Sequence, residues 1–104
     1  MELIAVLTTV ASVEEAQHLA RSIVERKLAA CAQLSEIESF YSWQGPLRNE
    51  SEVRIMFKTI KQNYRPLEAA IIELHPYDLP AIYSVDISAV YEPYAQWVAE
   101  GTTA

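Results

Sequence analysis

Residues 29–44, AACAQLSEIESFYSWQ, predict one long β-strand whose apolar positions change phase midway. The apolar side chains share one face at the start of this run and have the opposite parity later: first Ala30, Ala32 and Leu34, then Ile37, Tyr41 and Trp43. A shift of one residue predicts a bulge in the strand or a change in what covers it. Gly45-Pro46 breaks the run, and Arg48 to Glu50 are expected to complete a polar turn. Residues 51–60, SEVRIMFKTI, alternate cleanly between apolar and polar side chains, so the two strands predict a hairpin.

The segments on either side of the hairpin predict further strands and helices. The unbroken apolar run 3–9 predicts a central strand covered on both faces, and Ser12 with Glu15 predicts a capped helix over 13–27. A second helix through residue 74 and a strand over 82–90 follow the hairpin, and Pro93 opens a short terminal helix. This order is the ferredoxin-like split βαβ pattern of an α+β protein, in a single domain over 1–104.

The predicted hairpin is longer than the helices that would cover it. A helix over 13–27 spans about 22 Å at 1.5 Å per residue. A strand over 30–43 extends about 46 Å at ~3.3 Å per residue. Because the protruding part carries apolar side chains such as Phe40 and Trp43, we expect further copies of the chain to cover it and pair with its edges. The alternative is a hairpin that curls over its own sheet.

Charge and cysteine content exclude several classes of partner. The net charge is −6, from 14 acidic and 8 basic side chains, which disfavours binding to nucleic acid. Cys31 is the single cysteine, so an internal disulfide is impossible and a reducing compartment is expected. The apolar run 3–7 is too short for a signal core or a membrane span. We therefore expect a cytoplasmic protein without membrane contact.

Residues 73–80, ELHPYDLP, hold a histidine that is followed directly by a proline, and an aromatic residue, a carboxylate and a second proline come after it. Pro76 disfavours the helical conformation for His75, so the second helix should end there. One proline would have sufficed for that purpose. His75 and Tyr77 are therefore also candidates for lining a cleft between subunits.

Three further residues are candidates for that cleft. Cys31 is expected to be a small buried hydrophobe or, if Lys58 lies nearby, a thiolate in a cleft. Lys58 could be a solvated charge or an anion-binding group. Trp43 is expected at a subunit interface, with ligand stacking as the alternative. The ligand-cleft candidates are thus Cys31, Trp43, Lys58, His75 and Tyr77.

Five motifs, in order along nearly the whole chain, resemble the CutA family of divalent-cation tolerance proteins. They are Lys27-Leu28-Ala29-Ala30-Cys31, Tyr41-Ser42-Trp43-Gln44-Gly45, Ser51-Glu52-Val53 with Lys58-Thr59, Leu74-His75-Pro76-Tyr77-Asp78-Leu79-Pro80, and Tyr94-Ala95-Gln96-Trp97. The resemblance implies a ferredoxin-like subunit, a homotrimer built by strand pairing between chains, and a link to metal tolerance.

The resemblance also bears on metal binding. Copper-binding relatives use a cysteine near the end of the first strand and paired histidines before the proline. Thr8 and Leu74 stand at those places here, which leaves His75 alone. Because threonine and leucine are poor ligands for copper, we expect no required cofactor and at most a weak contact between His75 and a divalent cation.

Three functions are compatible with the sequence. The leading one is a non-enzymatic, homotrimeric binding or signalling module tied to divalent cations. A small-molecule-modifying enzyme is the alternative, and it requires His75, Lys58 and Cys31 to converge in an inter-subunit cleft. A purely structural trimeric scaffold is the third. No familiar spacing of nucleophile, base and orienting residue occurs, which favours the non-enzymatic reading.

Overall fold

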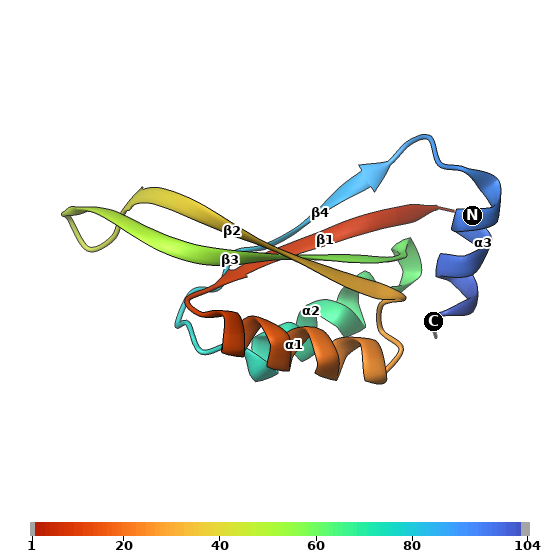
Figure 1. The fold of residues 1–104 in the computed structure, drawn as a ribbon, viewed down its shortest axis with the longest axis horizontal. Coiled ribbons are helices and arrows are strands. Elements are labelled where there is room, and N and C mark those ends of the chain that lie inside the picture. The colour runs from red at the N-terminus through yellow and green to blue at the C-terminus, as the bar shows by residue number, and fades with distance from the viewer. Residues whose placement is uncertain (1, 103–104) are drawn as a thin grey trace.

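The computed structural model describes residues 2–102, which form a four-stranded antiparallel sheet and three α-helices (Figure 1). In chain order the elements are β1 (Leu3–Val10), α1 (Val13–Glu25), β2 (Cys31–Ser42), β3 (Leu47–Ile60), a 3-10 turn (Lys61–Asn63), α2 (Tyr64–Leu74), β4 (Ile82–Ile87) and α3 (Glu92–Glu100). The strand order is β2-β3-β1-β4, and every neighbouring pair is antiparallel. The predicted α+β class and element order are confirmed.

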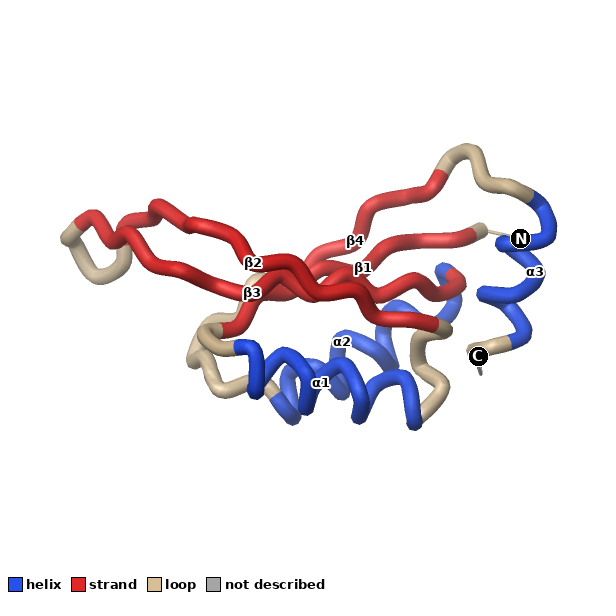
Figure 2. Tube along the Cα trace, viewed as in Figure 1, coloured by secondary structure: helices blue, strands red, loops and turns tan. Residues whose placement is uncertain are grey.

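Helices α1 and α2 lie side by side on one face of the sheet (Figure 1, Figure 2). They bury apolar side chains against β1 and β3, with Phe57 at 0% exposure among the largest. The helical spacing of the apolar positions in α1 directs Ala16, Leu19 and Ile23 into this core. Most of the chain's apolar burial is therefore on this face.

In the part of the chain that the structure describes, no helix covers the opposite face of the sheet along most of its length (Figure 1). Strand β1 is nonetheless buried on both faces, as its unbroken apolar run predicts, and it lies between β3 and β4 in the sheet. At one end α3 packs against Leu3 through Ala95 and Val98. Tyr83 and Val85 of β4 remain about half exposed on this face.

The predicted helix boundaries have clear local causes. The Ser12 hydroxyl oxygen accepts a hydrogen bond from the Glu15 N–H at 3.2 Å, which caps α1. Helix α2 ends at Leu74 because His75, which precedes a proline, is extended (φ −81°, ψ 134°). Helix α1 ends at Glu25, earlier than the predicted residue 27, because Lys27 turns into the left-handed region (φ 60°).

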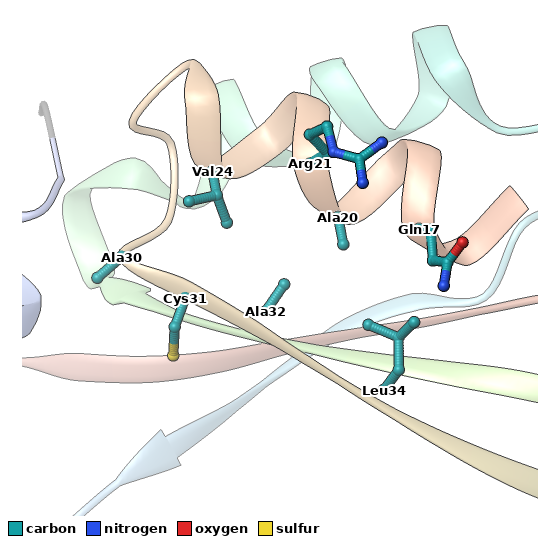
Figure 3. Close-up of a pocket in the computed structure, with 8 residues that line it drawn as sticks. All are labelled: Gln17, Ala20, Arg21, Val24, Ala30, Cys31, Ala32 and Leu34. Atoms are coloured by element: carbon teal, nitrogen blue, oxygen red, sulfur yellow. The ribbon is translucent and has the colours of Figure 1, made fainter. Parts of the chain in front are cut away.

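The hairpin differs from the prediction in its turn and in its regularity. Strand β3 begins at Leu47, and Tyr41 pairs with Arg48, so the polar turn expected over 48–50 was wrong. The chain reverses earlier, at Gln44 (φ 55°) and Gly45 (φ 108°). Pairing between β2 and β3 runs without interruption from Cys31↔Lys58 to Ser42↔Leu47, so there is no bulge in this ladder. The alternative, a change of covering partner, accounts for the phase shift. The apolar residues of β2 face α1 as far as Leu34, which lies beside Gln17 in the first half of that helix, and those beyond it face the other side (Figure 3).

The end of the hairpin protrudes well past the helices (Figure 1, Figure 2). The described chain measures 45 × 25 × 21 Å, and the hairpin lies along its longest dimension. Apolar side chains on it are exposed, including Phe40 at 66% and Leu47 at 73%. The hairpin therefore does not curl over its own sheet. Strand β4 is also shorter than the predicted 82–90, since it ends at Ile87.

Candidate functional site

The structure divides the five cleft candidates between two places on the chain. Cys31 and Lys58 face each other across β2 and β3 near α3. His75 and Tyr77 lie beyond α2, beside the opposite ends of β1 and β3, where they contact Thr9 and Glu52. Glu52 and Lys58 are six residues apart on one strand, a separation of about 20 Å at ~3.3 Å per residue.

His75 uses both of its ring nitrogens within the chain. Nε2 lies 2.8 Å from the carbonyl oxygen of Thr9, and because a carbonyl can only accept, Nε2 carries the proton. Nδ1 accepts a hydrogen bond from the Tyr77 N–H at 3.1 Å. Burial is the main cause that lowers the pKa of His75, which keeps the ring neutral at neutral pH. The histidine therefore joins the end of β1 to the loop after α2.

This geometry bears directly on the metal hypothesis. A metal ion needs a free nitrogen lone pair, and Nδ1 already gives its lone pair to Tyr77. Among residues 2–102, no group of three or more His, Cys, Asp or Glu side chains is arranged to hold a metal ion. The weak metal contact at His75 stays a prediction, and it now requires the Tyr77 N–H to be displaced.

Tyr77 connects the same loop to the hairpin strand. Its hydroxyl donates a 2.8 Å hydrogen bond to Glu52 Oε2, and Glu52 is only 8% exposed. Burial, followed by the hydrogen bond to Glu52, raises the pKa of Tyr77 well above its usual value. The phenol therefore remains protonated and acts as a donor. The rings of His75 and Tyr77 also pack together, with their centroids 4.8 Å apart.

An open groove of about 760 Å³ extends from Tyr77 along the base of the hairpin. The hairpin, the loop after α2 and the first residues of β4 all contribute to it. Its walls are largely aromatic, formed by Phe40, Tyr41, Trp43, Tyr77 and Tyr83. Its charged side chains are Glu50, Glu52, Arg54 and Asp78. Trp43 and Tyr77, both predicted from the sequence, thus line the same groove.

Sequence reasoning did not identify the acidic side of this groove. Glu52 was placed only on the polar face of an alternating strand, and its burial under Tyr77 depends on a contact 25 residues away in sequence. Tyr41 donates a hydrogen bond to Glu50, a relationship that follows from the register of β2 and β3. A predicted turn that ended at Pro46, without Arg48 to Glu50, would have given that register and hence this pair.

The second cluster surrounds Cys31 on the side of the sheet opposite α1 and α2, at the end where α3 packs. Its Sγ lies 3.7 Å from the Tyr94 hydroxyl, and burial is the main cause that raises the pKa of Tyr94. Lys58 Nζ donates to Gln33 Oε1 at 2.7 Å and lies 5.8 Å from the centre of the Tyr94 ring. Lys58 is therefore close to this cluster, and its ammonium group donates a hydrogen bond to the Gln33 side-chain amide.

A shallow hollow of about 490 Å³ lies between α1 and the start of β2 (Figure 3). Small apolar side chains such as Ala20, Val24 and Ala32 face one another across it, whereas the sulfur of Cys31 points away from α1. Among residues 2–102, no cluster of catalytic or ligating groups therefore lines this hollow.

The convergence required by the enzyme hypothesis does not occur within one chain. Cys31 and Lys58 are together, but His75 lies at the other end of β3 from them. Only an assembly that brings the two places together from different subunits could combine them.

Among the helices of residues 2–102, none is long and apolar enough to cross a membrane.

Comparison with known proteins gives consistent results over nearly the whole chain. The family model described as CutA1 divalent ion tolerance protein matches residues 4–101. The divalent-cation tolerance protein CutA of Thermococcus kodakarensis is 39% identical over 99 residues, which cover 95% of each chain.

Solved structures agree in fold. The crystal structure of CutA1 from Pyrococcus horikoshii is 37% identical, with a TM-score of 0.94 over 97% of this chain and 99% of that chain. The periplasmic divalent cation tolerance protein CutA from Archaeoglobus fulgidus is 27% identical, with a TM-score of 0.93 over 95% of this chain and 97% of that chain. With its sequence and its topology both matched from end to end, the chain belongs to the CutA1 divalent ion tolerance family.

Proposed function

We propose that this chain is a homotrimeric, non-enzymatic binding or signalling module that contributes to divalent-cation tolerance. The observation that carries the proposal is the family match over residues 4–101, because relatives of this length are named for divalent-cation tolerance. A cytoplasmic location is part of the proposal and rests on the single cysteine.

The exposed hairpin supports the assembly. Strands β2 and β4 are the edges of the sheet, and apolar side chains lie on the protruding hairpin and on β4. Exposed apolar edges of this kind favour pairing with another chain. The number three comes from the family resemblance, whereas the exposed edges call only for more than one copy.

Cation binding by this module is proposed to be weak. His75 is the residue suggested for copper or another divalent cation, and its Nδ1 must first lose the hydrogen bond from Tyr77. One imidazole also leaves most of a copper or zinc coordination shell to be filled. We therefore expect a dissociation constant in the micromolar range or weaker for Cu(II).

Growth under metal stress tests the proposal. Cells that lack the chain should grow more poorly than the parent strain at raised Cu(II) or Zn(II), and re-expression of the wild-type chain should restore growth. A parallel strain carrying the empty vector is the control. Equal growth of all strains across a metal titration would contradict a role in tolerance.

A further inference from the structure

The loop between α2 and β4, residues 75–81, leads directly into an edge strand of the sheet (Figure 1). The last residues that pair between β1 and β4 are Thr8 and Ile82. His75, at the start of the loop, donates a hydrogen bond from Nε2 to the carbonyl oxygen of Thr9, which is the next residue of β1. This hydrogen bond therefore fixes the entry to β4 relative to the end of β1.

Tyr77 attaches the same loop to the hairpin at the place where the hairpin leaves the sheet. The last residues that pair between β1 and β3 are Val10 and Val53. Toward the tip, β3 pairs with β2 alone, beginning with Glu52 opposite Ile37. Glu52 is the residue that accepts the hydrogen bond from the Tyr77 hydroxyl. The loop thus connects β4 to the base of the protruding hairpin.

The direction of the hairpin beyond this point depends on what holds its base. Leu47, where β3 begins, is five residues from Glu52, which is a distance of about 17 Å at ~3.3 Å per residue. Two-stranded ribbons vary more in twist than larger sheets do, so a ribbon of this length has no fixed direction of its own. Pro76 and Pro80 restrict the backbone of the loop that carries Tyr77. A restricted loop bonded to Glu52 can therefore hold the hairpin at one angle to β4.

We propose that Tyr77 is a positioning residue for assembly, because its hydrogen bond to Glu52 sets the direction of the hairpin relative to β4. The inference rests on the proposed homotrimer, in which neighbouring copies contact these two parts of the chain. A ring closes after three copies only if each copy presents its two contact surfaces at the required angle. The hydrogen bond lies within one chain, so it is retained when neighbouring copies cover the hairpin and β4.

Subunit exchange between isotope-labelled and unlabelled chains, followed by native mass spectrometry, tests the proposal. Tyr77→Phe removes only the hydroxyl that donates to Glu52. Trimers of this variant should exchange chains roughly tenfold faster than trimers of the wild type, the factor expected when a hydrogen bond to a charged group is lost. Circular dichroism should show the same helix content in both, because no bond within a helix is removed.

Tyr64→Phe is the matched control. The Tyr64 hydroxyl donates to Glu68 across 2.9 Å, which is the same chemistry as the 2.8 Å contact between Tyr77 and Glu52. Both residues of the control pair belong to α2, on the face of the sheet that the helices cover (Figure 1). Loss of the Tyr64 hydroxyl should therefore leave the exchange rate unchanged. Equal acceleration in both variants would overturn the proposal, because a general loss of stability would then explain it.

A second variant separates the lost contact from the effect of an unpaired buried charge. In Tyr77→Phe the Glu52 carboxylate stays buried without its donor, whereas Glu52→Leu removes the carboxylate and the contact together. If the direction of the hairpin is the cause, both variants should exchange faster than the wild type. Unchanged exchange in Glu52→Leu would overturn the proposal and assign the effect of Tyr77→Phe to the buried charge.

The wild type distinguishes this inference from the proposed function. If the wild type is a trimer and Tyr77→Phe exchanges chains at the same rate, the positioning role is overturned and the trimer stands. A wild type that is monomeric at micromolar concentration would overturn both.

Discussion

The Tyr77 hydroxyl donates a hydrogen bond to Glu52 across 2.8 Å and so joins the loop after α2 to the base of the hairpin. The hydrogen bond between His75 and the Thr9 carbonyl ties the same loop to the end of β1, so the Tyr77 contact is the second of two attachments. The Tyr77 contact also gives the buried Glu52 carboxylate a donor.

Tyr77→Phe should destabilise the chain by about 1–3 kcal/mol, because the Glu52 carboxylate would remain buried without this donor. Urea denaturation followed by circular dichroism measures the change. Tyr91→Phe removes the same atom from a residue that is 76% exposed and should have little effect. Equal stabilities of wild type and Tyr77→Phe would show that the contact contributes nothing to folding.

The stability of the chain should fall as the pH falls below about 6.5, because burial lowers the pKa of folded His75 below the value of 6.5 expected when it is unfolded. The unfolded state then binds the proton first. The stabilisation is complete above the pKa that His75 has in the unfolded chain. It is lost as the pH falls to the pKa that His75 has in the folded chain.

Denaturation midpoints at a series of pH values for wild type and His75→Ala check this expectation. The advantage of the wild type should be greatest above pH ~6.5 and should shrink as the pH falls. His18→Ala, which removes an exposed histidine on α1, should keep the pH dependence of the wild type. If the denaturation midpoint of His75→Ala depends on pH in the same way as that of the wild type, the pH dependence belongs to other groups.

Trp43→Ala should weaken assembly, because Trp43 lies on the protruding hairpin that other copies are proposed to cover. Removing a filled aromatic contact costs roughly 3 kcal/mol or more. Light scattering over a dilution series should show a trimer for the wild type and earlier dissociation for the variant. Trp97→Ala on α3 serves as a control of equal size, and a wild-type monomer at micromolar concentration would contradict the assembly proposal.

Gly45→Ala should destabilise the hairpin by about 1–2 kcal/mol, because φ at this position is +108°, which an alanine side chain rarely adopts. An added Cβ would meet nothing within 4 Å, so the cost is conformational and not steric crowding. Thermal unfolding measures it. Gln44→Gly, at the neighbouring left-handed residue, should not lower the midpoint, and a drop equal to that of Gly45→Ala would refute the backbone explanation.

The fold could be predicted because its main signals are local. The phase of the apolar residues in α1, the Ser12 cap and the proline after His75 each act within a few residues, and the structure confirms them. The change of phase in β2 was ambiguous, because a bulge and a change of covering layer give the same pattern of letters. The unbroken register with β3 decides for the covering layer.

The candidate site was harder to predict because it depends on contacts between distant segments. His75 was identified as unusual, but the bond from its Nε2 to the Thr9 carbonyl spans 66 residues. The spacing of residues along the chain cannot show that both ring nitrogens of His75 are hydrogen-bonded. It is these two hydrogen bonds that bear on metal binding. The burial of Glu52 could not be predicted for the same reason. Alternation of apolar and polar residues shows which face of the strand Glu52 is on, but it does not show which residues cover that face.

The regular pairing of β3 with β2 has a mechanical consequence. One unkinked strand is anchored in the core at Phe57 and reaches the hairpin tip at Leu47, so the pair can act as a lever arm. A ligand or subunit that displaces the tip meets no bulge at which the motion could be absorbed locally. The displacement would be transmitted along β3 toward β1, its hydrogen-bonded neighbour at the centre of the sheet.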